Sequence, residues 1–269
     1  MIGERERPLR IGGVPYLNGQ PLTAWLRSDS CDADVEYVEE VPSRLAELLA
    51  DDSLDVAIVS SIEAIRNPRV LALPDMSIAC YGPVRSVRIF SKVPVQRIRT
   101  LAADNSSLTS VALAQGLLKE SYGLTVNMLT MPPDPVAMLD SCDAAVMIGD
   151  RALLGVDAPH VLDLGAAWKE HTGLPFVFAL WLVNDPAVGA RAHSILRRAH
   201  AWGCARRAQI ARDWSRPRGM PLDMATEYLV SIMQYDLDAA KRAALDRFSE
   251  MCGACGLTGS AQRVRYVTV

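Results

Sequence analysis

The chain has 269 residues, of which 50% are hydrophobic and 22% are charged, a balance typical of a globular protein and not of a disordered one. Its 28 Lys and Arg against 31 Asp and Glu leave a net charge of −3, so composition excludes a strongly basic surface and we expect no nucleic-acid partner. This length allows one large domain or two small ones, each with its own core.

The N-terminal residues carry charges and run directly into an apolar segment that glycines interrupt. They form no continuous hydrophobic stretch of the kind that a signal peptide needs. The longest apolar run, Leu174 to Val183, is about half as long as a segment that crosses a bilayer. We therefore expect a cytoplasmic protein with no membrane partner.

Strand and helix signals alternate over the first sixty residues. Leu9–Val14 predicts a strand, and Pro21 then opens a short helix. Val35–Val38 predicts a second strand, and Pro42–Leu49 predicts a helix with its leucines on one face. Leu54–Val59 is a β-branched apolar run, as expected of a strand that is buried on both sides. This order predicts a parallel sheet with helices on either side.

A second unit of the same kind follows. Thr100–Ala103 predicts a strand, Ser107–Tyr122 a helix and Thr125–Leu129 another strand. Asp143–Ile148 then resembles the earlier Asp55–Ser60, since each is an Asp-led buried strand that follows a helix and ends in small polar residues. Two similar α/β units in one short chain indicate two lobes.

The last third of the sequence predicts mostly helices. Val188 to Trp202 follows helical spacing, Asp223 and Asp238 are candidate caps of later helices, and Gly253 is the expected end of the last one. With no sheet of their own to cover, these helices are expected to pack on the first lobe. We expect residues 1–91 and 182–269 to form the first lobe and residues 92–181 the second, with a cleft between them.

Polar residues follow the predicted strands at the ends where ligands bind in open parallel sheets. The run from Asn105 to Ser110 places hydroxyl groups at a helix start, beside backbone N–H groups that attract a carboxylate or a phosphate. Ordinary helix capping by Ser106 or Ser107 is the alternative. The same position after the other strands is held by Tyr16, Asn18, Ser60, Ser61, Glu63, Gly149 and Asp150.

Other motifs have a structural and a chemical interpretation. Cys252 and Cys255 form a single CxxC motif. It is either a metal or redox site or the end of a helix, and without a second pair of ligands we expect no metal. The Arg-rich stretch from Arg191 to Arg218 is typical of the solvated face of an amphipathic helix. His171 is the histidine nearest to a candidate site. The sequence contains no P-loop, no Rossmann GxGxxG and no GxSxG.

One ordered set of motifs spans about two-thirds of the chain. It comprises Val14-Pro-Tyr-Leu-Asn18, Pro21-Leu22, Pro42-Ser43, Asp55 to Glu63, Gly82 to Ser91, Ser107 to Ser110, Ile148 to Leu153, Asp163 to Trp168, and Thr172 to Phe178 with Trp181. In this order the motifs resemble those of the menaquinone-pathway chorismate dehydratases. The resemblance implies an α/β, two-lobed fold like that of type II periplasmic binding proteins. Each lobe is expected to be a mostly parallel sheet flanked by helices, with the cleft between the lobes.

The resemblance also implies an activity, the conversion of chorismate into 3-[(1-carboxyvinyl)oxy]benzoate and water as the first step of the futalosine route to menaquinone. A sister branch of the family makes 1,4-dihydroxy-6-naphthoate and has a Pro-Asn-Asp-Thr type of first loop, whereas this chain has Tyr16-Leu-Asn18. The chain departs from the family at Glu63-Ala64, where the family has Glu-Tyr. A non-catalytic protein that binds small anions remains the alternative of a different class.

On this resemblance the catalytic residues are Asn18, Ser86 and Asp150, and no cofactor or metal is required. Asp150, Glu63 and the substrate's own enolpyruvyl carboxylate remain as alternative proton acceptors. The expected partner is chorismate, a dicarboxylate, and the oligomeric state stays open. The substrate-binding residues are expected to be Tyr16, Ser60, Ser61, Ser106, Ser107, Thr109, Ser110, Gly149 and Trp168.

Overall fold

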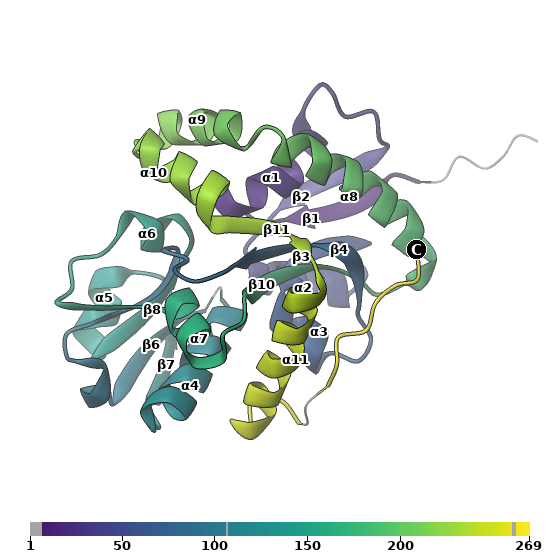
Figure 1. Ribbon diagram of the computed structural model, residues 1–269. Helices are drawn as coiled ribbons and strands as arrows, with labels where there is room; N and C mark the ends of the chain where they lie inside the picture. Colours follow the sequence, from purple (N-terminus) through teal and green to yellow (C-terminus); the bar gives the residue numbers. More distant parts are fainter. Residues whose placement is uncertain (1–6, 106, 260–261) are drawn as a thin grey trace, which may run out of the picture.

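Two β-sheets, each covered by helices, organise the chain into two lobes (Figure 1). The structure is a computed structural model that describes residues 7–105, 107–259 and 262–269. In each sheet the strands pair in parallel on one side and antiparallel on the other.

The first sheet has the strand order β11-β4-β10-β3-β1-β2. Its parallel half is β2, β1 and β3, and every residue of β3 is buried, as expected for a strand between two layers of helices. The strands are β1 (Leu9–Gly13), β2 (Val35–Glu39), β3 (Val56–Ser60), β4 (Leu71–Cys80), β10 (Phe176–Val183) and β11 (Met233–Leu237).

The second sheet has the order β7-β6-β8-β5-β9, with β7, β6 and β8 in parallel and β5 antiparallel to both of its neighbours. Its strands are β5 (Val87–Ser91), β6 (Thr100–Asp104), β7 (Asn127–Met131), β8 (Ala144–Ile148) and β9 (His160–Asp163).

Helices follow the strands in both lobes and then dominate the C-terminal third. Those of the first part are α1 (Gln20–Thr23), α2 (Pro42–Ala50) and α3 (Ser61–Arg66); those of the second lobe are α4 (Thr109–Tyr122), α5 (Pro135–Ser141), α6 (Gly149–Leu154) and α7 (Leu164–Thr172). The last part contains α8 (Gly189–Cys204), α9 (Arg207–Arg218), α10 (Leu222–Glu227) and α11 (Ala239–Ala254), and the π-helical segment η5 spans Tyr228–Ile232. Short 3₁₀ turns lie at η1 (Leu17–Gly19), η2 (Ala24–Arg27), η3 (Val95–Arg97) and η4 (Pro186–Val188). No helix among the described residues is both long enough and apolar enough to cross a membrane.

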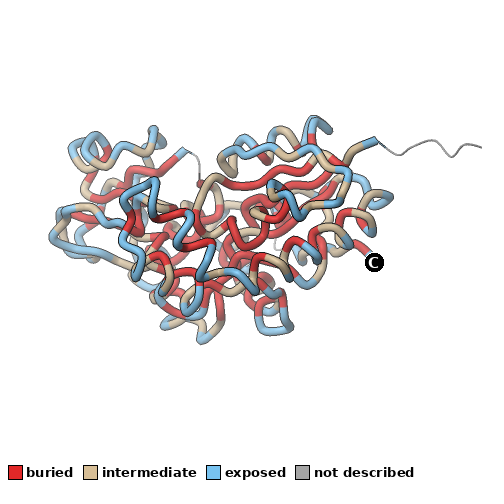
Figure 2. The backbone as a smooth tube through the Cα atoms, turned by 90° about the horizontal axis from the view of Figure 1, so that it is seen from above, coloured by how far each residue is buried: buried red, intermediate tan, exposed pale blue. Residues whose placement is uncertain are grey.

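One continuous hydrophobic core contains residues of both lobes. Figure 2 shows buried segments running through both lobes. At the joint, Trp168 of α7, Phe176 of β10 and Phe248 of α11 pack edge to face, with ring centroids 5.1 Å apart for both Trp168–Phe176 and Phe176–Phe248. The lobes therefore share a packed base.

The structure confirms several of the predicted helices and strands, and it contains further strands that were not predicted. The helix over Val188 to Trp202 is α8, and Asp238 caps α11 by accepting the N–H of Lys241. Asp223 caps nothing, because α10 starts after Pro221. The predicted strand Thr125–Leu129 lies two residues later, as β7.

Two strands of the first sheet, β4 and β11, were not predicted. Both sheets are mixed where the sequence predicts mostly parallel ones, because β10 runs antiparallel to β3 in the first sheet and β5 runs antiparallel to β8 in the second. β4 contains Pro74 and a left-handed Asp75 (φ 71°), features that normally argue against a central strand. β11 lies inside the segment predicted as helical. β4 pairs antiparallel with both β10 and β11.

Strand pairing also indicates where the chain passes from one lobe to the other. The sequence predicts these boundaries between residues 91 and 92 and between residues 181 and 182. β5 pairs with β8 and β9 in the second sheet, and β10 pairs with β3 and β4 in the first. We propose on this basis that the crossings lie between β4 and β5 and between α7 and β10.

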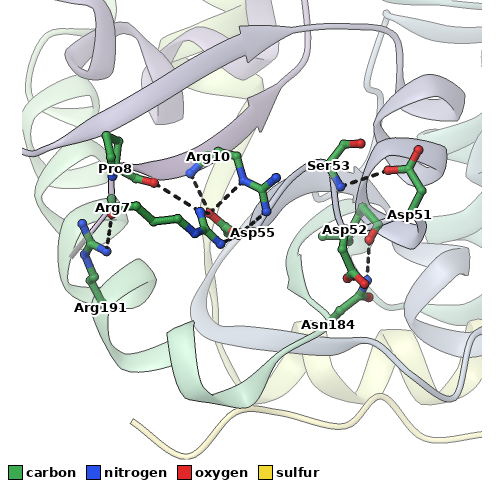
Figure 3. A network of polar contacts seen from close by, with 10 residues as sticks. Arg7, Pro8, Arg10, Asp51, Asp52, Ser53, Asp55, Asn184 and Arg191 are labelled. Atoms are coloured by element: carbon green, nitrogen blue, oxygen red, sulfur yellow. Dashed lines mark hydrogen bonds and ion pairs between the residues drawn. The ribbon is translucent and has the colours of Figure 1, made fainter.

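Asp55, the residue before β3, accepts hydrogen bonds from two arginines at the N-terminal end of β1 (Figure 3). Its carboxylate oxygens lie 2.6 Å from both terminal nitrogens of Arg7 and 2.8 Å from Nη2 of Arg10, and the backbone N–H of Arg10 donates at 2.9 Å. Burial alone would raise the pKa of Asp55, but the hydrogen bonds from Arg7 and Arg10 outweigh it and hold the pKa well below its ordinary value.

We expect Asp55→Asn to lower the free energy of unfolding by about 2 kcal/mol at pH 7, the worth of hydrogen bonds to a charged group. A lowered carboxyl pKa contributes stability that is complete above the ordinary value of about 3.9 and is lost as the pH falls towards the folded-state value. Urea unfolding at pH 7 and pH 3 measures this difference, which should shrink at pH 3. The control is Asp29→Asn, at an exposed position of the same lobe. Equal midpoints for both variants at pH 7 would contradict the prediction.

Candidate functional site

Two adjoining pockets lie between the lobes and share Tyr16 and Ile148. The outer pocket has a volume of about 690 Å³, and Glu47, Asp104, Asp150 and Arg151 are among its lining residues. The inner pocket is much narrower, with a volume of about 50 Å³. Its polar side chains come from both lobes: Tyr16, Asn18, Ser60, Ser107, Thr109 and Ser110.

The inner pocket combines hydroxyl groups with apolar walls. Ile58, Ile78, Val87 and Phe178 form the apolar part of the lining. None of the described residues that line it carries a charge. Such a lining suits a ring with attached anionic groups, which neutral N–H and O–H donors hold and apolar side chains flank.

The start of α4 brings the hydroxyl-rich run into the inner pocket. Ser107, Thr109 and Ser110 are all buried and line it, and α4 has the 14 residues of a full helix with a dipole at its N-terminus. Leu108 occupies the N-cap position and no described side chain caps the helix, so capping by Ser107 is not observed. Ser106 lies outside the described residues.

Ser60 and Ser61, which are adjacent in sequence, have different surroundings. Ser60 lines the inner pocket. Ser61 is fully buried, and its hydroxyl donates to the carbonyl of Val177 at 2.7 Å. The hydroxyl oxygen of Thr109 accepts the N–H of Ile62 at 3.1 Å, so α4 of the second lobe is bonded directly to the start of α3 in the first. Ser61 therefore faces protein backbone and is not part of the pocket lining.

Asp150 connects the two lobes at the boundary of the outer pocket. Its Oδ1 accepts the backbone N–H of Leu17 at 3.1 Å, and its Oδ2 accepts the indole N–H of Trp214 at 2.8 Å. Burial raises the pKa of the Asp150 carboxyl, and these two hydrogen bonds oppose the rise without cancelling it. The Arg218 guanidinium lies 3.5 Å from the centroid of the Trp214 ring. We call this bridge, made by Asp150, Leu17 and Trp214, the interlobe bridge.

Gly149, the residue before Asp150, lies against the ring of Tyr16. Its φ is +66°, and a Cβ atom built there would be 2.8 Å from Cδ1 of Tyr16. Only glycine permits both the left-handed backbone and this close approach. Gly149 thus contributes space and backbone to the pocket.

Asn18 and Ser86 have separate places. Asn18 lines the inner pocket, and its Oδ1 is buried with no hydrogen-bond partner among the described residues. Ser86 is buried beside the pocket, and its Oγ lies 2.6 Å from the hydroxyl of Tyr228. Sequence reasoning missed both Tyr228 and Trp214, because they lie in the C-terminal third, more than sixty residues from the motifs that they contact.

Three further candidates lie away from both pockets. Trp168 is in the core at the base of the lobes, and its indole N–H donates to the carbonyl of Pro175 at 2.8 Å. Glu63 forms an ion pair with Arg66. Nε2 of His171 in α7 lies 2.9 Å from a carboxylate oxygen of Glu120 in α4. Among the described residues, which include both members of the CxxC pair, no group of three or more His, Cys, Asp or Glu is arranged to hold a metal ion.

The fold and the pocket between the lobes define the class, and a comparison with solved structures agrees. The periplasmic aliphatic sulphonate binding protein SsuA from Escherichia coli superimposes with a TM-score of 0.66 at 17% identity, covering 98% of this chain and 94% of its own. The chain therefore has the periplasmic-binding-protein-like fold that its sequence predicts.

The family follows from sequence comparison. Residues 9–254 match the family described as "Menaquinone biosynthesis", and the chain belongs to it. A chorismate dehydratase from Thermus thermophilus is 30% identical over 268 residues, covering 92% of this chain and 96% of its own length. A chorismate dehydratase from Campylobacter jejuni is 30% identical over 254 residues, covering 92% of this chain and 99% of its own.

Proposed function

We propose that this protein is a chorismate dehydratase, a lyase that converts chorismate into 3-[(1-carboxyvinyl)oxy]benzoate and water as the first step of the futalosine route. The observation that carries the proposal is the 30% identity, over 92% of the chain, to each of two proteins of that name. The inner pocket has a lining that suits this substrate.

The reaction requires correct orientation of the substrate more than a strong acid or base. Chorismate carries one carboxylate on the ring and one on the enolpyruvyl arm. Loss of the C3 proton and the C4 hydroxyl makes the ring aromatic, so the product is far lower in free energy. The protein has to orient the substrate, let the proton leave and assist the departing hydroxide. The reaction has no redox step, and its chemistry requires no cofactor.

The inner pocket offers donors on two opposite walls for the two carboxylates. Ser60 lies on the wall of the first lobe, and Ser107, Thr109 and Ser110 lie on the wall of the second. The dipole of α4 adds a favourable field for an anion at the second wall. Tyr16 and Asn18 then lie beside the reacting part of the ring.

The surroundings of the two acidic candidates favour the substrate's own enolpyruvyl carboxylate as proton acceptor. Both oxygens of Asp150 already accept hydrogen bonds in the interlobe bridge. Glu63 is paired with Arg66 and is not among the residues that line either pocket. In this mechanism the protein fixes the carboxylate near the C3 proton and excludes water.

We expect Glu63→Gln to retain kcat within about threefold of the wild type, because a residue outside the pocket loses less than one ordinary hydrogen bond's worth of transition-state stabilisation. Steady-state kinetics with chorismate measure this. Loss of turnover in a Glu63→Gln protein that unfolds at the wild-type temperature would identify Glu63 as the base and contradict the substrate-assisted mechanism.

The narrow inner pocket implies that the lobes move during a reaction cycle. Ligand pockets usually have volumes of about 300–1,000 Å³, whereas the inner pocket has about 50 Å³. Chorismate therefore enters through the outer pocket as the lobes part, and the lobes close over it.

The proposal is tested by mixing the purified protein with chorismate and following the products by mass spectrometry. Catalytic formation of a species lighter by one water, with an aromatic absorption spectrum, is the expected result. Unchanged chorismate would contradict the proposal, and the naphthoate-forming sister activity and binding without turnover would then be assayed in that order. A cytoplasmic location stays a prediction, which cell fractionation tests.

A further inference from the structure

The first turn of α3 is capped by a residue of the other lobe. A helix N-cap residue normally accepts the N–H of the second or third helical residue with its own side chain. Ser60 occupies the N-cap position of α3, yet its hydroxyl makes no capping hydrogen bond. The N–H of Ile62, the second residue of α3, donates instead to the hydroxyl oxygen of Thr109 at 3.1 Å. Thr109 opens α4 in the second lobe, so this cap crosses the boundary between the lobes.

The adjacent hydroxyl of Ser61 has a different partner. Ser61 is fully buried and donates its hydrogen to the carbonyl of Val177 at 2.7 Å. Its oxygen lies 3.4 Å from the hydroxyl oxygen of Thr109, beyond the range of about 2.5–3.0 Å for an ordinary hydrogen bond between hydroxyl groups. Ser61 is therefore committed to β10. This leaves Thr109 and Ser60 as the two described hydroxyls that can serve the N–H of Ile62.

The cap from Thr109 leaves the Ser60 hydroxyl available to a ligand. Ser60 is 6% exposed and lines the inner pocket. Its ψ of 129° lies in the range of the β region, which N-cap residues adopt. Rotation about its Cα–Cβ bond therefore moves the hydroxyl from the pocket wall to the first turn of α3 without a change of the backbone.

We propose that Thr109 is a positioning residue that caps α3 from the opposite lobe and thereby keeps the Ser60 hydroxyl turned towards the inner pocket, where it donates to a carboxylate of the substrate. When the lobes part, the N–H of Ile62 loses this acceptor and Ser60 turns back to cap its own helix. Binding of the anion and closure of the lobes then favour each other. The identity of the ligand rests on the proposed dehydratase function, whereas the exchange of caps does not.

Thr109→Val keeps the shape of the side chain and removes the hydroxyl. We expect it to lower kcat/KM for chorismate about tenfold, the worth of one net hydrogen bond. Thr109→Ser restores the hydroxyl and should stay within about threefold of the wild type. The matched control is Thr100→Val, because the Thr100 hydroxyl also accepts a backbone N–H, that of Asp143 at 2.8 Å, but inside the second lobe. Equal kcat/KM values for Thr109→Val and Thr100→Val would overturn the proposal.

A double-mutant cycle with Ser60→Ala separates a cap from a direct contact with the substrate. In the wild type, Ser60→Ala should lower kcat/KM about tenfold. In Thr109→Val, where Ser60 has already turned to α3, the same change should cause little further loss. Multiplicative losses would mean that the two hydroxyls act on the substrate independently, against the proposal.

Thermal unfolding without substrate keeps the inference distinct from the proposed function. Because Ser60 caps nothing in the wild type, Ser60→Ala should leave the melting temperature nearly unchanged there. In Thr109→Val the same change removes the replacement cap and should lower the melting temperature by about 2–4 °C. A wild type that leaves chorismate intact would refute the dehydratase function, while the melting temperatures still decide the exchange of caps. The same shift in both backgrounds would overturn that exchange.

Discussion

Asp150→Asn is expected to lower kcat/KM for chorismate about 10- to 100-fold. The carboxylate accepts N–H groups from Leu17 and Trp214, and a neutral amide has a single oxygen and turns N–H groups towards the second donor. Loss of one hydrogen bond to a charged group costs about 1.5–3 kcal/mol. Because Asp150 belongs to the second lobe and both donors to the first, this cost falls on the closed arrangement of the lobes.

The pH dependence of the Asp150 variant separates closure from stability. Since burial raises the pKa of Asp150, its carboxylate takes up a proton, and the interlobe bridge weakens, at a higher pH than for an ordinary aspartate. The acidic limb of kcat/KM should therefore lie above the ordinary range in the wild type and disappear in the variant. A raised carboxyl pKa contributes stability only at low pH and loses it as the pH rises, so the variant should melt at an unchanged or higher temperature at pH 7.

Steady-state kinetics from pH 4 to 8, with Asp140→Asn as control, test this prediction. Asp140 is an exposed residue of α5 in the same lobe, so its variant has the same change of charge without a bridge to lose. Two results would contradict the role in closure: wild-type kinetics in Asp150→Asn, or complete loss of turnover in folded protein, which would make Asp150 the proton acceptor.

Gly149→Ala is also expected to lower kcat/KM about 10- to 100-fold, in this case through a steric collision. The new methyl group would lie 2.8 Å from Cδ1 of Tyr16, closer than two carbon atoms allow. Overpacking of this kind costs about 1–3 kcal/mol. The strain is relieved by moving the Tyr16 ring or by parting the lobes, and either movement disturbs the inner pocket.

Gly123→Ala is a matched control for the backbone. Gly123 has the same φ of +66°, and nothing lies within 4 Å of a Cβ atom built there. Both alanines bear the left-handed penalty of roughly 1 kcal/mol in stability, but only the change at Gly149 introduces a collision. Chorismate kinetics and melting temperatures of both variants measure the difference. Equal kcat/KM values would show that the contact between Gly149 and Tyr16 has no part in the reaction.

The sequence alone determined the class of fold and most of the local elements. The spacing and type of the apolar residues were sufficient to predict two elements. β3 is a β-branched run that is buried along its whole length, and the apolar residues of α8 recur at helical spacing. Tyr16, Asn18, Ser60 and Gly149, which follow predicted strands, all line one pocket. These properties depend on neighbours in the chain, so local patterns express them.

The tertiary structure decided which of these residues face the pocket and what holds them there. Ser60 and Ser61 are equivalent in sequence, yet one lines the pocket and the other donates to Val177. Trp168 belongs to the expected motif set but packs in the core. The partners of Asp150 and Ser86, namely Trp214 and Tyr228, come from the C-terminal third. No local pattern predicts such pairs, because they form only when the chain returns from the second lobe and packs its last helices on the first.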